Sequence, residues 1–501
     1  MAKRIHKTKK TPLFKNVGFY FVLLYALLTL GMIVQVFTVN VIPMKYAMIV
    51  CVILLLLLLG MYYLQLGKKV NKVNKVLGKI LIVILAIFLG VGNWYLFKTG
   101  SAFSRMTGDD TQTSVVSVVV MKESKAESIE DLKNSKFGLT KTGTQETMEK
   151  GLADIKKDAG QDITTVDYKS YKTIADDLYD GKIDAIIMDE ATRSLFEDNH
   201  SKFDSETRIV KSYKYKTSTK DISKNVDVTS EPFNIYITGI DTYGTISTVS
   251  RSDVNMIATV NPKTHQVLLT SIPRDYYVPQ PCQGGQTDKL THTGIFGVDC
   301  TVETVENYFG IDINYYVRVN FSSVENIVDA LGGINVDSPI AFNALGYSFS
   351  AGTNSLNGKE ALAFSRERYS LGGGDRDRGK NQMRVITGII NKAISPSIIT
   401  NYTSILDAVS GSFQTNMSNS EMTSLIKMQI NDMSGWDIEQ ISVNGTGNSS
   451  AWSPANGFNS WVMEPNVETV KRAVEVIKKV ENGEDVKALA QQVMEENTAD
   501  E

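Results

Sequence analysis

Three long apolar stretches near the start of the chain constrain its fold most. They run from about residue 18 to 39, 46 to 66 and 80 to 97, and none contains Asp, Glu, Lys or Arg. A helix needs about 20 apolar residues to cross a bilayer, and the third stretch is near the lower limit. The first is too long for a cleavable signal peptide, and a second follows at once. We therefore expect three transmembrane helices within residues 18–98.

Lysine and arginine residues around these stretches predict their orientation. Six such residues precede the first stretch, one lies between the first and second, and five lie between the second and third. Positively charged segments remain in the cytoplasm. We expect a multi-pass protein of the cell membrane, with residues 1–17 in the cytoplasm and the domains that follow the third crossing outside the cell.

The first region after the membrane part has the pattern of a small α/β domain. A polar linker at 99–113 leads into this accessory domain, which we place at 114–215. Strands are expected at 114–121, 136–139 and 185–188, with a helix start at Ser128 and a helix over 142–156. Residues 128–190 resemble one lobe of a solute-binding domain, although a spacer or docking module is the simpler interpretation.

A second, larger α/β domain is predicted at 230–480. Strands and helices alternate along it, which favours a central sheet flanked by helices. The expected strands are 234–240, 253–260, 266–272 and 334–336, and the expected helices are 322–331, 358–365, 382–392 and 467–480. Residues 481–501 are acidic and polar, so we expect a disordered tail.

The three cysteines divide between membrane and exported parts. Cys51 lies inside the second apolar stretch, where it suits a small apolar position. Cys282 and Cys300 are both in the exported part and eighteen residues apart. An oxidising location permits a disulfide between them, and two free thiols are the alternative.

Arginine is concentrated in one short segment. Five of the thirteen arginines fall within nineteen residues, close to the run Gly372–Gly374: Arg366, Arg368, Arg376, Arg378 and Arg384. Guanidinium is a planar, permanently charged fork that grips phosphate in a bidentate way. The cluster therefore predicts a site for a phosphorylated substrate, with a solvated charged loop as the alternative.

Charged residues also stand at the ends of the predicted strands. Asp241 follows the first strand of the larger domain, Arg251 and Asp253 open the second, and Arg274 with Asp275 follows the third. Such positions form the rim of an α/β sheet, where ligands usually bind. Two carboxylates among arginines suit Mg²⁺ bound to a substrate phosphate. Separately, each of these residues could be a turn cap or a surface ion pair.

Several other function classes have little support in the sequence. There is no Walker loop, and His200, His265 and His292 are too scattered for a zinc site. A net charge of −3 argues neither for nor against nucleic acid. The cytoplasmic parts, 1–17 and 67–79, are too short to fold a DNA-reading domain, so we expect no nucleic-acid partner.

Five segments of the larger domain together resemble the LytR-CpsA-Psr family. They follow the order of the family's motifs over about residues 233–395, which is more specific than any single motif. The segments are GIDTYG…SRSDVNMIATVNP, LLTSIPRD, INYYVRVNFSSVENIVDALGGINVDSP, LNGKEALAFSRER and GDRDRGKNQMRVI. The three spans and the accessory region resemble the streptococcal members that act in capsule synthesis.

The resemblance implies a fold and an activity. Members resemble phosphotransferases that move a glycopolymer, such as capsular polysaccharide, from undecaprenyl pyrophosphate to peptidoglycan through a phosphodiester. It implies Mg²⁺ (or Mn²⁺) as cofactor, and membrane lipid, the lipid-linked polysaccharide and peptidoglycan as partners. The fold would hold the polyprenyl chain in an apolar channel. Met256, Ile257, Leu268 and Leu269 could line it, although packing in the core is the expected role for most of them.

Site residues are carried over from the family motifs one by one. Catalytic roles are implied for Arg274, Arg366 and Asp241, and metal binding for Asp241 and Asp253. The pyrophosphate would be held by Arg251, Arg274, Arg366, Arg368, Arg378 and Gln382. The chain departs from the family where many members have a second arginine before the glutamine, because Asn381 stands there. Arg376 or Arg384 would have to replace it.

Two alternatives from other classes remain. A membrane regulator, an attenuator of capsule synthesis, would act through a partner such as a capsule-synthesis kinase complex. A polyprenyl pyrophosphate hydrolase would use the same site with water as the acceptor. Assaying for a phosphate-linked product against free phosphate, with and without a glycan acceptor, separates these possibilities.

Overall fold

The computed structural model describes residues 14, 16–106, 111–140, 145–240, 246–395 and 411–499. The chain divides into two compact units. One comprises Met1–Ser104 with Ser420–Met433, and the other comprises Arg105–Asn419 with Ser434–Glu501. The first unit holds the apolar helices, and the second holds both α/β regions.

Three helices of the first unit are long and apolar enough to cross a membrane. They are α1 (Val17–Val39), α2 (Met44–Leu66) and α3 (Lys72–Met106). Their apolar residues pack around the buried side chains of Tyr25 and Ile82. Helix α3 is longer than the predicted third span, because the helix continues through lysines on both sides of the apolar stretch. Helix α13 (Asn419–Asp432) belongs to this unit as well.

The accessory region is a five-stranded sheet covered on both faces. Its strand order is β3-β2-β4-β1-β5, in which β1 is antiparallel to β4 and β5, and β2 is parallel to β3 and β4. The strands are β1 (Thr111–Met121), β2 (Lys136–Thr140), β3 (Thr164–Tyr168), β4 (Ala185–Asp189) and β5 (Thr207–Ser218). The side chains of α4 (Gln145–Ala159) pack on one face, and those of α5 (Tyr171–Tyr179), α6 (Arg193–Glu197) and α7 (Phe203–Glu206) pack on the other.

One predicted helix of this region is reduced to a turn. Only the 3-10 turn Glu130–Leu132 follows Ser128. The Ser128 backbone N–H and Oγ both donate to Asp131 Oδ2, at 2.8 and 2.9 Å. The cap chemistry is therefore present, but only three residues of 3-10 geometry follow it.

A six-stranded mixed sheet forms the larger domain, in the order β16-β11-β6-β7-β8-β17. Its strands are β6 (Phe233–Gly239), β7 (Val254–Asn261), β8 (Gln266–Ile272), β11 (Tyr315–Val319), β16 (Phe413–Thr415) and β17 (Asp437–Ser442). Strand β6 is parallel to β11, β8 is parallel to β17, and β7 is antiparallel to β6 and β8. The carboxyl ends of β6, β8, β11 and β17 therefore meet the amino end of β7 at one edge.

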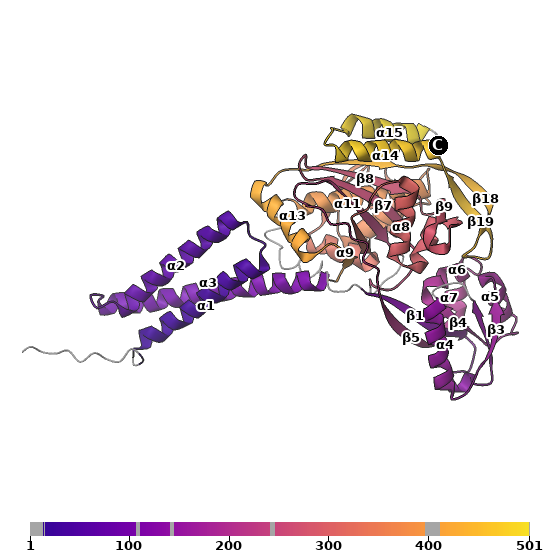
Figure 1. Cartoon of the computed structure of the whole chain (residues 1–501), viewed down its shortest axis with the longest axis horizontal. Helices are drawn as coiled ribbons and strands as arrows, with labels where there is room; N and C mark the ends of the chain where they lie inside the picture. The colour runs from indigo at the N-terminus through magenta and orange to yellow at the C-terminus, as the bar shows by residue number, and fades with distance from the viewer. Residues whose placement is uncertain are drawn as a thin grey trace, which may run out of the picture. The chain divides into compact units, whose positions relative to one another are not determined.

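Helices cover both faces of this sheet (Figure 1). The face that carries Ile257 and Leu268 packs against α8 (Val298–Phe309), α14 (Val467–Glu481) and α15 (Lys487–Ala499). On the opposite face, Gln440 Nε2 of β17 donates to Thr387 Oγ1 of α11 (Asp375–Ala393) at 2.8 Å. Helix α11 shares a separate apolar cluster with α9 (Phe321–Ala330) and α10 (Gly358–Arg366). That cluster includes β12 (Ile334–Ser338), β13 (Phe342–Ala344), β14 (Tyr347–Phe349) and β15 (Gly352–Leu356).

The end of the chain corrects the prediction of a disordered tail. Residues 487–499 form α15, and Val486, Ala490 and Val493 are buried in the main core. These three apolar residues follow a helical spacing. The acidic residues around them hid this helical pattern in the sequence. The structure shows that the apolar face of the helix packs against β17.

The two cysteines of the larger domain are joined. Cys282 and Cys300 form a disulfide with a Cα–Cα distance of 5.4 Å, within the usual range for such a bond. It ties the turn Pro281–Gln283 to the first turn of α8. Cys51 is free and buried.

The accessory region and the larger domain share a continuous apolar core. Val249, Ile295 and Ala455 of the larger domain are buried in the same cluster as the accessory residues around α5 and α6. Two backbone hydrogen bonds reinforce this junction, from Thr113 N to Ser247 O at 2.8 Å and from Val249 N to Thr113 O at 3.1 Å. The two regions are therefore packed as one body, which fixes α6 beside the sheet edge described next.

Candidate active site

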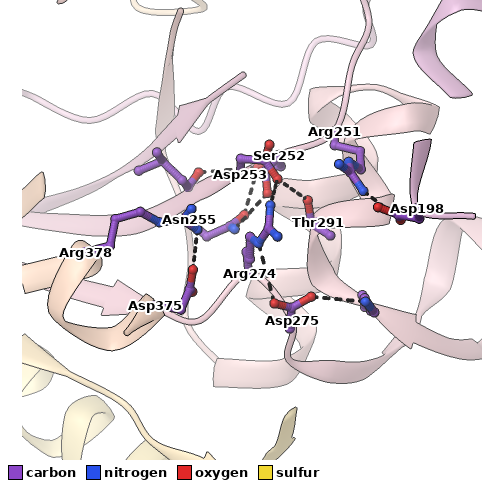
Figure 2. Close-up of polar contacts among 12 residues, drawn as sticks. Asp198, Arg251, Ser252, Asp253, Asn255, Arg274, Asp275, Thr291, Asp375 and Arg378 are labelled. Carbon is purple, nitrogen blue, oxygen red and sulfur yellow. Dashed lines mark hydrogen bonds and ion pairs between the residues drawn. The ribbon is translucent and has the colours of Figure 1, made fainter. Parts of the chain in front are cut away.

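Charged side chains from three separate loops converge at one edge of the main sheet (Figure 2). Arg251 and Asp253 directly precede β7, and Arg274 follows β8. Arg274 Nη1 donates to Asp253 Oδ1 at 2.8 Å, and Thr291 Oγ1 donates to the same oxygen at 2.9 Å. The strand-end pattern in the sequence thus places these residues together, because β7 runs against β6 and β8.

Backbone contacts hold these loops in register. Asp253 N donates to Gly239 O at 2.8 Å, and Thr291 N donates to Arg274 O at 2.8 Å. Gly294 allows the closest approach, since a Cβ there would lie 2.5 Å from both the Ser250 oxygen and the Ser252 nitrogen. Any larger residue would push the loops apart. The position of Asp253 is therefore set by backbone contacts as well as by its side-chain partners.

Asp253 is an ionised carboxylate despite its burial. Burial alone would raise its pKa, but the charges of Arg274 and Arg251, the hydrogen bond from Thr291 and the charge of Arg378 together lower it. Both hydrogen bonds to the carboxylate end on Oδ1. The group therefore keeps its negative charge at neutral pH and retains coordination capacity on Oδ2.

Arg274 is held from two sides. Besides Asp253, its Nε lies 3.5 Å from Asp275 Oδ2, and Lys289 Nζ lies 3.3 Å from the other oxygen of Asp275. Burial acts to lower the pKa of Arg274, but the carboxylates of Asp253, Asp275 and Asp375 outweigh it and raise the pKa. Figure 2 shows Arg274 between Asp253 and Asp275. Its guanidinium is thus charged and preorganised.

Helix α11 brings two residues of the arginine cluster into the site. It begins at Asp375, seven residues before the predicted helix, so it includes Arg376 and Arg378. The first two turns of the helix line a cavity that Asp253 and Arg274 also line. The side chains that the helix contributes to the cavity wall include Arg376, Arg378 and Gln382. Gly379 permits this approach, because a Cβ there would lie 2.7 Å from Ser271 Oγ.

Arg378 is buried close to other positive charges in this cavity. It forms an ion pair with Asp375, one helical turn earlier. Its pKa is lowered, first by burial and then by the positive charges of Arg274 and Arg368, although Asp375 and Asp253 oppose this. The positive charges that lower the pKa of Arg378 favour the binding of an anion in this cavity.

The other members of the cluster lie in different surroundings. The Arg366 guanidinium stacks over the Phe321 ring at 4.1 Å, just beyond the carboxyl end of β11. Arg368 Nη2 donates to Tyr369 Oη at 2.7 Å. Arg366 therefore lies at the same sheet edge as the carboxyl end of β6, whereas Arg368 contacts an exposed tyrosine next to it in the chain.

The departure from the family at Asn381 has a local explanation. Asn381 Oδ1 accepts a hydrogen bond from Arg384 Nη1 at 2.7 Å, and its amide donates to Phe364 O at 3.3 Å. Arg376, in contrast, lines the cavity, and its Nη1 donates to Asn444 Oδ1 at 3.0 Å. Arg376 is thus better placed than Arg384 to replace the missing arginine.

Asp241, predicted as both a metal ligand and a catalytic residue, lies outside the described residues. The described residues nevertheless fit a magnesium ion. Mg²⁺ is usually bound by one or two carboxylates together with substrate phosphates and water, and Asp253 supplies an ionised carboxylate at the cavity. Among the described residues, no group of three or more His, Cys, Asp or Glu could hold a metal ion. A metal here would therefore depend on the substrate phosphates for several of its ligands.

Sequence reasoning missed one contributor to the site. Arg251 Nη1 donates to Asp198 Oδ2 at 3.1 Å, and Asp198 follows α6 of the accessory region. Arg251 and Asp198 are 53 residues apart in the chain. No motif marks Asp198, so only the packing of the two α/β regions reveals the contact.

The apolar strand residues proposed for a channel are buried. Ile257 and Leu268 belong to the core beneath α8 and α14, as packing alone predicted. Met256 and Leu269 point to the opposite face and are fully buried as well. A channel role for those two stays a prediction.

The chain combines three helices long and apolar enough to cross a membrane with an α/β domain that has several arginines at one edge of its main sheet. The family model described as LytR_cpsA_psr family matches residues 196–475, more than half of the chain. The chain therefore belongs to the LytR-CpsA-Psr family, as its motifs predicted. A second model, described as DNA polymerase processivity factor, matches residues 68–188, less than half of the chain.

Curated relatives match a little less than half of this chain. A polyisoprenyl-teichoic acid–peptidoglycan teichoic acid transferase, TagU, of Enterococcus faecalis is 40% identical over 238 residues, 46% of this chain and 77% of that protein. The TagU of Bacillus subtilis is 40% identical over 205 residues, 41% of this chain and 65% of that protein. The crystal structure of B. subtilis TagU is 34% identical and covers 50% of this chain and 96% of that chain, with a TM-score of 0.40.

Proposed function

We propose that this protein transfers a capsular polysaccharide, or a similar glycopolymer, from an undecaprenyl pyrophosphate carrier to peptidoglycan. The observation that carries the proposal is the cavity in which Arg274, Arg376 and Arg378 surround an ionised Asp253. The relatives named as teichoic acid transferases support a glycopolymer donor and a peptidoglycan acceptor. The three apolar helices support a tether at the surface where a lipid-linked donor lies.

The reaction is a displacement at phosphorus. A peptidoglycan hydroxyl attacks the phosphorus that bears the polymer, and a new phosphorus–oxygen bond forms. The bond from that phosphorus to the bridging oxygen of the pyrophosphate breaks, and undecaprenyl phosphate leaves. The hydroxyl proton passes to a base or to water, and Asp241 is the candidate base among the predicted site residues.

The chain's own residues bind and stabilise the charge. Arg251, Arg274, Arg366, Arg368 and Arg378, with Gln382, are proposed to hold the pyrophosphate, and Arg274 and Arg366 to stabilise the charge that grows in the transition state. Asp253 positions the Arg274 fork through their hydrogen bond. Asp241 and Asp253 would hold Mg²⁺ or Mn²⁺, which would neutralise phosphate charge when bound.

A capsule-attachment assay tests this function. Replacing Arg274 with alanine removes a preorganised donor, which should cost about 2–4 kcal/mol of transition-state stabilisation, or about 30- to 1,000-fold in rate. We expect an Arg274→Ala strain to lose most covalent polysaccharide from its purified cell wall. Arg472→Ala is the matched control, because Arg472 pairs with Glu475 on the surface of α14 and, among the described residues, does not line either cavity. Normal attachment in the Arg274→Ala strain would sink the proposal.

An assay with purified protein separates the alternatives. Full-length protein in lipid nanodiscs is given a lipid-pyrophosphate donor, with and without glycan strands, and with Mg²⁺ or a chelator. A phosphodiester-linked product that needs the acceptor and the metal supports the transferase. Free phosphorylated polymer in equal amounts with and without the acceptor indicates the hydrolase, and no turnover of the donor would favour a regulator.

A further inference from the structure

We propose that a second cavity beside the phosphate site is the subsite for a sugar ring of the acceptor glycan, and that the accessory region forms part of its wall. The cavity has a volume of about 300 Å³ and is lined by Arg251, Arg274, Asp198, Asp275, Phe458 and Trp461, among others. This proposal rests on the proposed function and extends it, because it assigns a place to the attacking group.

Arg274 separates the two cavities. It lines the one that contains Arg376, Arg378 and Gln382, and it also lines the one that contains Phe458 and Trp461. A displacement at phosphorus needs the attacking oxygen on one side of the phosphoryl group and the leaving oxygen on the other. Two adjoining cavities that share Arg274 provide this arrangement, with the pyrophosphate on the side of α11 and the acceptor on the other side. Arg251, which lines the acceptor cavity, would contact the pyrophosphate from that side.

The two cavities differ in lining chemistry. Phe458 and Trp461 line the proposed acceptor cavity, whereas no aromatic residue is among the described residues that line the cavity beside α11. Phe458 and Trp461 belong to β19 (Phe458–Pro465), which pairs with β18 (Gly445–Ser453) in an antiparallel hairpin. An aromatic ring offers flat apolar area with a negative face, which suits the C–H groups of a sugar ring. The volume lies at the lower end of the range for small-molecule pockets, about 300–1,000 Å³, so it suits a sugar unit better than a polymer.

An unsatisfied amide in the wall also indicates a ligand. Asn456 lines this cavity and is 1% exposed, and its Oδ1 has no hydrogen-bond partner among the residues that the structure describes. A buried acceptor without a partner is costly. A sugar hydroxyl or an acetamido N–H is a donor that would satisfy it.

Asp198 closes the cavity from the accessory region. Its side chain is 36% exposed, while its Oδ2 accepts from Arg251. The remaining oxygen is available to accept a hydrogen bond from a ligand hydroxyl. Because the accessory region and the larger domain share one apolar core, this wall is fixed in place. The accessory region is thereby assigned a role in binding the acceptor.

Steady-state kinetics of full-length protein in nanodiscs test the proposal. The donor is an undecaprenyl-pyrophosphate-linked oligosaccharide, and the acceptor is a short, unsubstituted peptidoglycan glycan strand. We expect Trp461→Ala to raise the KM for the acceptor about tenfold, which is the loss of one good contact, and to leave the KM for the donor within about twofold. Asp198→Asn should also raise the KM for the acceptor about tenfold, but its KM for the donor is not used as a criterion, because Asp198 pairs with Arg251.

Trp452→Ala is the matched control. Trp452 lies on the same hairpin and is 54% exposed, against 45% for Trp461, but it is not among the residues that line the cavity. We expect its KM for the acceptor to match that of the unmodified protein. Asp198→Asn keeps size and exposure, so it stays informative if Trp461→Ala does not fold.

Each remaining outcome overturns the proposal. An unchanged acceptor KM in both variants shows that the cavity does not hold the acceptor, and a raised donor KM in Trp461→Ala assigns the cavity to the donor sugar. An equal loss in Trp452→Ala places binding on the hairpin as a whole. If the unmodified protein neither binds the donor nor transfers it, the proposed function itself fails, and this result is distinct from the others.

Discussion

The arginines at the sheet edge differ in the side chains that each of them contacts. Arg274 is paired with Asp253 and Asp275, and Arg251 is paired with Asp198, which belongs to another region of the chain. Arg366 stacks on Phe321. A substrate phosphate would therefore bind guanidinium groups that are already held in place, which lowers the entropic cost of ordering these side chains on binding.

Glu197, at the end of α6, is a carboxyl whose titration should affect stability. Burial is the main cause that raises its pKa to about 7, followed by the hydrogen bond and charge of Asp204, while Arg251 and Arg193 act in the opposite direction. Its unfolded-state pKa is about 4.3. A carboxyl with a raised folded-state pKa stabilises the fold fully at low pH, and this stabilisation is lost as the pH rises from about 4.3 to about 7.

We expect Glu197→Gln to raise the Tm at pH 8 by about 2–5 °C, because glutamine cannot ionise in the half-buried position. At pH 4.5 the Tm should change little. Thermal unfolding followed by circular dichroism from pH 4.5 to 8 measures both values. Glu468→Gln, at an exposed position, should give a constant offset instead. A Glu197→Gln curve parallel to that of the unmodified protein would contradict the assignment.

At the scale of elements, the β18–β19 hairpin depends on one buried carboxylate. Asp288, in β10 (Gln286–Lys289), accepts from Ser453 Oγ at 2.8 Å and from Ala455 N at 2.9 Å. His292 Nδ1 lies 3.1 Å from the same carboxylate. Burial acts to raise the pKa of Asp288, but the hydrogen bond and charge of His292 and the bonds to the hairpin lower it.

Asp288→Asn should loosen this hairpin. An amide NH₂ would face a donor in place of one carboxylate oxygen, so a buried network would be left partly unsatisfied at a cost of about 3 kcal/mol. Hydrogen exchange should become faster in residues 445–465 and stay unchanged in the accessory sheet. Asp312→Asn, which removes an exposed partner of Lys224, is the control and should cost less than about 1 kcal/mol. Unchanged exchange in the hairpin would show that Asp288 does not support it.

Helix α11 shows why an element boundary was missed. Its first turn, in GDRDRG, has no apolar periodicity, so the pattern predicted a start at residue 382. The helix begins at Asp375 because acidic residues in the first turn favour the helix amino end, and because Gly379 lets the backbone approach β8. The seven residues gained by this shift include Arg376 and Arg378, which line the cavity.

At the scale of the whole molecule, three apolar helices precede two α/β regions that pack as one body. The charge pattern predicts that the N-terminus is cytoplasmic and that the α/β regions are outside. This orientation would place the anion site on the side of the membrane where peptidoglycan lies.

Cysteine labelling of intact cells tests the orientation. In a Cys51→Ala background, a membrane-impermeant maleimide should label Lys220→Cys, which is an exposed position. It should label Asn71→Cys, between the second and third helices, only after the cells are broken. Labelling of Asn71→Cys in intact cells would reverse the predicted topology.

The sequence by itself determined the three long apolar helices, the family and the seven strands that it predicted, which correspond to β1, β2, β4, β6, β7, β8 and β12. It also predicted the residue types of the site. Hydropathy, period-two alternation and strand-end charges are local signals, so Asp253 and Arg274 could be assigned to one edge. Tertiary structure decided which side chains meet there. Asp198 accepts a hydrogen bond from Arg251, and Arg376 rather than Arg384 lines the cavity. Val493 is buried in the main core, so the predicted polar tail is a packed helix. These outcomes depend on contacts between segments far apart in the chain, and local patterns do not encode such contacts.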